Sequence, residues 1–130
     1  MYMANRDFQG MEEDRLRLVA RLIGEGIKYL HDKGIVHRDI KAENILMSDN
    51  SDKSVPIIAD FGFARRITDG KPCDTMCGTK NYMALEILEN KPYTFSVDIW
   101  SFGILLYVLV TGHHFPFPRP NGKLNKNNID

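Results

Sequence analysis

Residues 37–44 read His37-Arg38-Asp39-Ile40-Lys41-Ala42-Glu43-Asn44, and residues 60–62 read Asp60-Phe61-Gly62. The first segment places a carboxylate, an ammonium group and an amide on one short loop, and the second adds another carboxylate. This set suits phosphoryl transfer, because Asp39 can accept the proton of a substrate hydroxyl and Lys41 can neutralise the transferring phosphoryl group. Asn44 and Asp60 supply hard oxygen ligands that can hold Mg²⁺ against the phosphates of ATP. The two segments therefore predict a phosphoryl-transfer site.

The residues between the two segments predict how they come together. Residues 45–47 and 55–59 have the composition of short strands, while residues 48–54 have turn composition. Asn44 directly precedes the first strand, and Asp60 directly follows the second. Because an antiparallel hairpin brings these two positions to the same end, the sequence predicts that both magnesium ligands lie there. His37 and Phe61 are expected to pack beneath the site rather than to react.

An amphipathic helix is predicted over residues 12–32. Acidic residues 12–14 complement the positive end of its dipole, and Gly34 is expected to end it in a left-handed cap. Ile35-Val36 would then form a short buried strand that leads into the loop of Asp39. The apolar positions recur at helical spacing: Leu16, Val19, Ala20, Ile23, Ile27 and Leu30.

Residues 96–111 predict a helix of a different kind. The segment is apolar on nearly every face, which is typical of a helix surrounded by other elements. Its most hydrophobic part, residues 99–110, is well short of the roughly 20 residues that span a bilayer. Residues 64–82 show no periodicity and are predicted to form a loop. Together, these elements indicate an α+β fold that is mainly helical.

The order of these motifs resembles that of the eukaryotic protein kinases, in which an H-x-D loop is followed by D-F-G. Residues 78–86 resemble the end of the kinase activation segment, and residues 98–103 resemble the start of the long central helix of the larger lobe. Thr111-Gly112 with Pro116-Phe117 resembles the turn that leaves this helix. Small-molecule phosphotransferases share the H-x-D loop but are not expected to carry segments 84–86 and 98–103 as well.

The resemblance covers the larger lobe only. The glycine-rich loop, the strand lysine and the helix glutamate of the smaller lobe are not found among these 130 residues, and residues 1–5 resemble the hinge between the lobes. We therefore expect a partial large lobe over residues 1–117, with the catalytic hairpin and the central helix but without the small lobe. Residues 118–130 are polar and rich in asparagine, and they are expected to form a disordered tail.

The resemblance also implies roles for single residues. Lys41, two positions after the base, marks the serine/threonine class, and Thr79 matches the threonine that contacts the base and this lysine. Arg38 stands where the family has its phosphate-sensing arginine. Because a guanidinium binds phosphate in a bidentate manner, its expected partner is a phosphorylated threonine, with Thr75 as the first candidate and Thr68 as the second.

Three positions depart from the family pattern. Leu85 replaces the proline between Ala84 and Glu86, and Lys80-Asn81 replaces a proline–glutamate pair, which puts the shape of the peptide-acceptor site in doubt. Glu86 would pair in the family with an arginine of later helices, which these residues lack. Because an unpaired buried carboxylate is costly, we expect Glu86 to be exposed or its surroundings to be loosened.

Composition limits the expected partners. Lys+Arg and Asp+Glu both number 17, so the net charge is zero and no overall field favours nucleic acid or a membrane surface. No apolar run of signal-peptide length follows Met1, and a cytoplasmic or nuclear location is expected. Cys73 and Cys77 have no partner at metal-ligand spacing. This favours two reduced thiols over a redox-sensitive pair in the activation loop.

The resemblance implies a serine/threonine protein kinase that uses ATP and Mg²⁺ to phosphorylate hydroxyl groups of a protein substrate. The phrases D-F-G-F-A-R and C-D-T-M-C-G-T suggest the calcium/calmodulin-dependent-like or the fused and autophagy-initiating groups. An upstream activating kinase is a further expected partner. Because half of the phosphate clamp is missing, the 130 residues alone are expected to be inactive. The alternative is a catalytically inactive kinase-like fragment, either a binding module or a truncated gene product.

Overall fold

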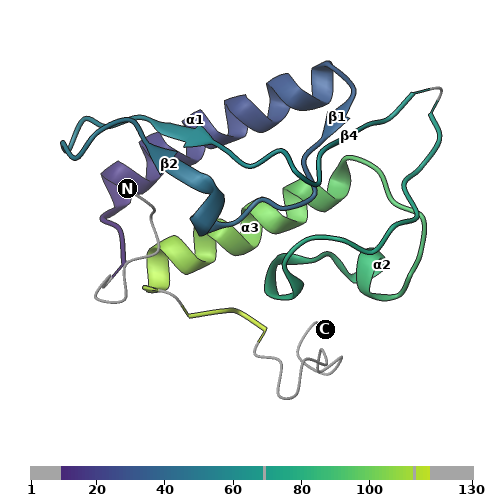
Figure 1. The fold of residues 1–130 in the computed structure, drawn as a ribbon. Coiled ribbons are helices and arrows are strands. Elements are labelled where there is room, and N and C mark those ends of the chain that lie inside the picture. The colour runs from purple at the N-terminus through teal and green to yellow at the C-terminus, as the bar shows by residue number, and fades with distance from the viewer. Residues whose placement is uncertain (1–9, 69, 113, 118–130) are drawn as a thin grey trace.

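The computed structural model describes residues 10–68, 70–112 and 114–117. The hinge predicted at residues 1–5 and the tail predicted at residues 118–130 lie outside the described residues. Two long helices, α1 and α3, run in opposite directions against each other (Figure 1). The elements follow in the order α1 (Glu13–Asp32), β1 (Ile35–Val36), η1 (Ala42–Asn44), β2 (Ile45–Met47), β3 (Pro56–Ile58), β4 (Arg65–Arg66), η2 (Lys80–Tyr82), α2 (Leu85–Leu88) and α3 (Ser96–Thr111). The predicted α+β, mainly helical fold is confirmed.

Helix α1 forms much as its periodicity predicts. It begins at Glu13, one residue after the predicted start, and two acidic residues occupy its first turn. Gly34 has a φ of +73°, and its N–H donates to the carbonyl oxygen of His31 at 2.9 Å. The predicted left-handed residue after the helix is therefore confirmed. The buried stripe of α1 comprises Val19, Ile23, Ile27 and Leu30.

The predicted hairpin is present and holds the two expected magnesium ligands at one end. Strands β2 and β3 pair antiparallel, with Ile45 opposite Ile58. One step further, the N–H of Ala59 donates to the carbonyl oxygen of Asn44 at 2.8 Å. This pairing continues to the residue directly before Asp60. Strand β3 is shorter than the predicted range of 55–59.

The prediction that residues 64–82 form a loop without regular structure is wrong in two places. Strand β4 pairs antiparallel with β1, with Val36 opposite Arg65, and η2 closes the segment. A two-residue strand is too short to show the alternation that marks a strand in sequence. Its partner fixes it instead, and the N–H of Ile67 extends the ladder by donating to the carbonyl oxygen of Gly34 at 2.7 Å.

The buried residues form two clusters that share Trp100 at their edges. The larger cluster joins α1, the hairpin and α3, and the smaller one joins β1, α2 and the start of α3. Helix α3 was predicted to be covered on nearly every face, but Ile99, Tyr107 and Val110 are about half exposed. That prediction is therefore wrong along one side of α3. No helix in the described ranges has the length and apolar character required to cross a membrane.

Candidate functional site

Asp39 lies at the centre of a closed set of polar contacts. Its carboxylate is 3% exposed, and Oδ1 accepts a hydrogen bond from the hydroxyl of Thr79 at 2.7 Å. Nζ of Lys41 lies 2.9 Å from Asp39 Oδ2 and also donates to Thr79 Oγ1 at 2.7 Å. The three side chains form a triangle in which each contacts the other two. Thr79 comes from a segment remote in sequence, so the fold brings together three residues that the sequence singled out.

The surroundings of Asp39 favour its charged form. Burial by itself raises the pKa of the carboxyl, but hydrogen bonds from Lys41, Thr79 and Asn44, together with the charge of Lys41, outweigh burial. The net effect is a lowered pKa. Asp39 is therefore an ionised group whose oxygens are held in fixed directions, as a proton acceptor beside a hydroxyl requires.

Asn44 and Asp60 fit an oxygen-liganded cation. Asn44 is 6% exposed, and its Nδ2 donates to the Asp39 carbonyl oxygen at 2.8 Å and to Asp39 Oδ2 at 3.0 Å. Because the amide nitrogen is turned toward Asp39, the amide oxygen Oδ1 points away from it. Asp60 is exposed, and its Oδ1 accepts the N–H of Gly62 at 3.1 Å. These hard oxygen donors are the kind that Mg²⁺ prefers when substrate phosphates complete its shell.

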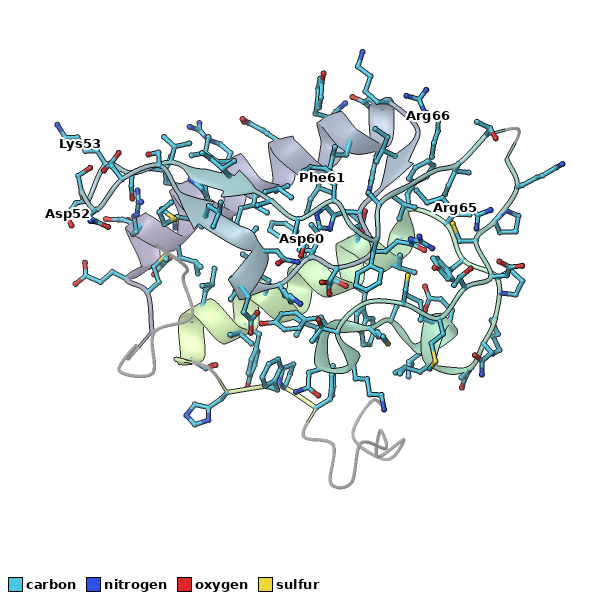
Figure 2. All side chains as sticks on the ribbon, in the orientation of Figure 1. Asp52, Lys53, Asp60, Phe61, Arg65 and Arg66 are labelled. Carbon is cyan, nitrogen blue, oxygen red and sulfur yellow. The ribbon has the colours of Figure 1, made fainter. Side chains whose placement is uncertain are left out.

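Figure 2 shows Asp60 near the middle of the molecule, whereas Asp52 and Lys53 lie far from it at the tip of the hairpin. In the described part of the chain, no three His, Cys, Asp or Glu side chains gather into a metal cluster. Phe61 was expected to pack beneath the site. Its ring centroid lies 5.1 Å from that of the buried His37 ring, but the Phe61 side chain is itself 49% exposed. The exposed carboxylate of Asp60 is therefore accessible to a ligand.

The backbone before Asp39 is held by a buried carboxylate on α3. Asp98 is 1% exposed, and its two oxygens accept the N–H groups of His37 and Arg38, each at 2.8 Å. Arg38 has a φ of +71°, a left-handed conformation that few non-glycine residues adopt. His37 Nε2 lies 3.1 Å from the carbonyl oxygen of Ala59, which links this loop to the strand before Asp60. His37 is fully buried, as the structural role expected of it requires.

Arg38 reaches toward the segment that carries Thr75 through one bridging hydroxyl. Its guanidinium donates from Nη1 to Tyr93 Oη at 3.1 Å and from Nε to the carbonyl oxygen of Phe63 at 2.6 Å. Tyr93 Oη in turn donates to the carbonyl oxygen of Thr75 at 2.7 Å. Burial raises the pKa of Tyr93 to about 12 despite the opposing hydrogen bond from Arg38, so the phenol keeps the proton that it donates. Thr75 and Thr68 are both exposed.

Two residues of this network were not predicted from the sequence. Asp98 was noted only as part of a helix start, although a carboxylate in the first turn of an otherwise apolar helix is itself a signal. Tyr93 gives no such signal, because it lies in an irregular segment. It reaches the site through backbone pairing with Cys73, whose N–H donates to the Tyr93 carbonyl oxygen at 2.7 Å. Both cysteines are free thiols.

The departures from the kinase pattern have simple local explanations. Leu85 is the first residue of α2, a position where proline and ordinary helix formers are both accepted. Lys80 and Asn81 are exposed in η2. Glu86 is partly exposed, so water reaches its carboxylate and the cost of a sealed, unpaired charge does not arise. The backbone of this segment keeps its hydrogen bonds despite the three replacements.

Comparison with known proteins is consistent with this geometry. The chain is 42% identical over 103 residues to the Inhibitor of nuclear factor kappa-B kinase subunit alpha of Xenopus tropicalis, and the match covers 79% of the chain and 14% of that protein. It is 42% identical over 107 residues to the Serine/threonine-protein kinase atg1 of Dictyostelium discoideum, covering 82% of the chain and 16% of that protein. A "Probable myosin light chain kinase" of the same organism is 43% identical over 102 residues, covering 78% of the chain and 26% of that protein.

The chain thus spans between 14% and 26% of the length of these relatives. Residues 2–130 match the family described as "Protein kinase domain". The matched range includes the loop of Asp39, the Asp60 segment and the helix that carries Asp98. The family match over residues 2–130 and the identity to these kinases agree with the arrangement of the site. The chain belongs to the protein kinase family.

Proposed function

We propose that this chain supplies the catalytic loop of a serine/threonine protein kinase, which transfers the γ-phosphoryl of ATP to a serine or threonine hydroxyl of a protein substrate. The observation that carries the proposal is the triangle of Asp39, Lys41 and Thr79, with contacts of 2.7 and 2.9 Å. Because Thr79 makes hydrogen bonds with both Asp39 and Lys41, it would fix both groups beside one substrate hydroxyl. The relative named a serine/threonine-protein kinase supports the same class.

Each group of the site has a place in the reaction. The substrate hydroxyl oxygen forms a bond to the γ-phosphorus while the bond from that phosphorus to the bridging oxygen of ADP breaks. The hydroxyl proton passes to Asp39, whose lowered pKa keeps the carboxylate ionised before the transfer. Lys41 lies within hydrogen-bond distance of Asp39 and is available to a phosphate oxygen. Positioning and charge, rather than covalent catalysis, supply the rate enhancement.

Asn44 and Asp60 are the residues that would hold Mg²⁺. When bound, the ion neutralises charge on the phosphates of ATP. The chain itself contributes the directions of the ligands, because Asn44 is fixed by two hydrogen bonds to Asp39 and Asp60 by the N–H of Gly62. The base and one of the two ligands are therefore positioned by the same contacts.

The proposal is tested by phosphate transfer from radiolabelled ATP to a mixture of serine and threonine peptides. The 130 residues are assayed alone and in a chimera, in which residues 10–117 replace the matching segment of the Dictyostelium atg1 kinase. We expect little transfer by the chain alone, because it lacks the phosphate-binding loop, and clear transfer by the chimera. Asp39→Asn and Asp60→Asn should each lower transfer by the chimera at least 100-fold, on the order of a lost catalytic group.

Asp52→Asn is the matched control, because it also removes an exposed aspartate but lies at the hairpin tip, away from Asp60 (Figure 2). It should leave transfer within about twofold of the unmodified chimera, as for a surface change that touches no site. An inactive chimera in the presence of an active parent enzyme would contradict the proposal. It would favour a kinase-like segment without catalytic competence.

A further inference from the structure

We infer that His31 is a positioning residue of the phosphoryl-transfer site, which holds the catalytic loop through Asp98 without touching substrate. The inference rests on the proposed function for what the loop does. It rests on contacts alone for how the loop is held. His31 lies in the last turn of α1, eight residues before Asp39, and outside every motif that predicted the site.

The contact joins α1 and α3, whose buried apolar side chains also pack in one cluster. His31 Nε2 lies 2.8 Å from Asp98 Oδ2, and the side chains of the pair are 16% and 1% exposed. The His31 ring also packs on Phe95, with 5.0 Å between ring centroids. The imidazole is therefore held on two sides, with its N–H directed at a carboxylate that water barely reaches. Helix α1 thereby contributes a donor to the first turn of α3.

The Asp98 carboxylate makes three polar contacts, two of them with the loop before Asp39. Oδ2 accepts from both His31 and the N–H of His37, while Oδ1 accepts from the N–H of Arg38. His37 and Arg38 directly precede Asp39, and Arg38 is in the left-handed conformation at φ +71°. A left-handed arginine persists only where its surroundings impose it. The direction of the Asp98 carboxylate is therefore part of what sets the position of Asp39.

His31 is the side-chain donor that fixes this direction. The last torsion of an aspartate is broad, so a carboxylate held only by two backbone groups of one loop could turn together with that loop. A donor on α1 opposes this turn, because α1 is anchored in the core by its buried apolar side chains. Loss of the donor also leaves a buried charge with fewer partners, which is costly. The competing explanation is that His31 only packs on Phe95.

Three variants of the full chain separate these explanations. His31→Phe keeps a ring against Phe95 but removes the donor, whereas His31→Gln keeps an N–H near the place of Nε2 and removes the ring. Ser54→Ala is the control, since it removes a buried hydroxyl that accepts from Arg15 at 2.9 Å, far from the loop. The measurement is amide hydrogen exchange at His37 and Arg38, normalised by the free energy of unfolding of each variant from urea denaturation.

We expect His31→Phe to speed exchange of these two amides about tenfold beyond the change in global stability, as for one charge-assisted hydrogen bond. His31→Gln should stay within about threefold of the unmodified chain, and Ser54→Ala should change both amides only in proportion to global stability. Two results would overturn the inference. One is normalised exchange in His31→Phe equal to that in Ser54→Ala. The other is that His31→Phe and His31→Gln speed exchange of the two amides equally.

The exchange measurement needs no nucleotide, so it separates this inference from the proposed function. If the chimera transfers no phosphate while the His37 and Arg38 amides respond as expected, the proposed function fails and the positioning role stands. If the chimera is active, His31→Phe in it should lower kcat about tenfold with KM for ATP within twofold, because the base is misplaced while nucleotide contacts remain. A raised KM with unchanged kcat would contradict a role in positioning Asp39.

Discussion

Replacing Gly78 by alanine should displace the loop of residues 37–39, because Gly78 lets the segment of Thr79 pass closely over that loop. Gly78 has a φ of +102°, and a Cβ atom there would lie well under 3.0 Å from the carbonyl oxygen of Arg38. It would also lie 3.8 Å from Asp39 Oδ1. The obstructing atom belongs to the backbone of Arg38, whose N–H is bound by Asp98, and not to a flexible side chain, so either the Thr79 segment or the loop of residues 37–39 must move.

Gly70 provides a matched control for the size of this effect. It also has a positive φ, +67°, but a Cβ atom there would meet nothing within 4 Å. Alanine at either position costs about 1–2 kcal/mol for the left-handed backbone, and both changes restrict the unfolded chain equally. Gly78→Ala additionally breaks the hydrogen bond of 2.7 Å from Thr79 to buried Asp39, which costs about 1–3 kcal/mol. The expected losses are therefore about 2–5 kcal/mol for Gly78→Ala and about 1–2 kcal/mol for Gly70→Ala.

Urea denaturation measures both free energies of unfolding, and the carboxyl carbon shift of Asp39 followed against pH measures its pKa. Because the Thr79 hydroxyl helps to lower the pKa of Asp39, Gly78→Ala should raise that pKa, whereas Gly70→Ala should leave it unchanged. Equal destabilisation by the two variants, together with an unchanged Asp39 pKa in both, would refute the reasoning. The close approach would then not hold Thr79 against Asp39.

Three further predictions concern other parts of the structure. The pKa of Asp39 is lowered from 3.8 in the folded chain, so its ionised form stabilises the fold above that pH, and this stability is lost as the pH falls through the lower folded pKa. In urea denaturation below pH 3.8, the free energy of unfolding should therefore fall more steeply with pH for the unmodified chain than for Asp39→Asn. Phosphorylation of Thr75 should protect residues 64–79 from proteolysis, because the phosphate pairs with Arg38. Arg38→Ala or phosphatase treatment should remove the protection. Equal cleavage with and without phosphate would show that Thr75 does not order this segment. Tyr107→Lys on the exposed side of α3 should lower binding of an apolar dye and change the free energy of unfolding by less than about 0.5 kcal/mol. Leu105→Ala in the core should instead lower the free energy of unfolding by about 2–5 kcal/mol. An unchanged dye signal in Tyr107→Lys would show that another surface binds the dye.

Local signals predicted the parts of the site that lie close together in sequence. The hairpin between Asn44 and Asp60 is short, and turn chemistry in residues 48–54 determines its reversal. Helix α1 follows from its apolar stripe, and its end follows from the conformational freedom of Gly34. In each case, the residues that specify the structure are neighbours along the chain. The pattern could therefore be recognised without knowledge of the tertiary fold.

The contacts that complete the site span long distances in sequence and could not be predicted this way. Thr79 was assigned by family resemblance, whereas its hydrogen bonds to Asp39 and Lys41 depend on how the whole intervening segment folds. The strand pair β1 and β4 is too short to carry a periodic pattern. The exposed side of α3 was missed for a related reason. Apolar composition indicates that a helix is stabilised by burial, but it does not show which neighbouring elements bury it or which side remains exposed.

Two residues of the site have left-handed backbones, and each is held by a carboxylate. Arg38 at φ +71° is stabilised by Asp98, which accepts its N–H from another element. Asp60 at φ +59° is stabilised locally, because its own Oδ1 accepts the N–H of Gly62; short polar side chains tolerate this conformation for that reason. The turn at Asp60 is thus specified by its own sequence, whereas the position of Asp39 depends on a helix far along the chain. Changes in α1 and α3 should therefore affect the position of Asp39 more than that of Asp60.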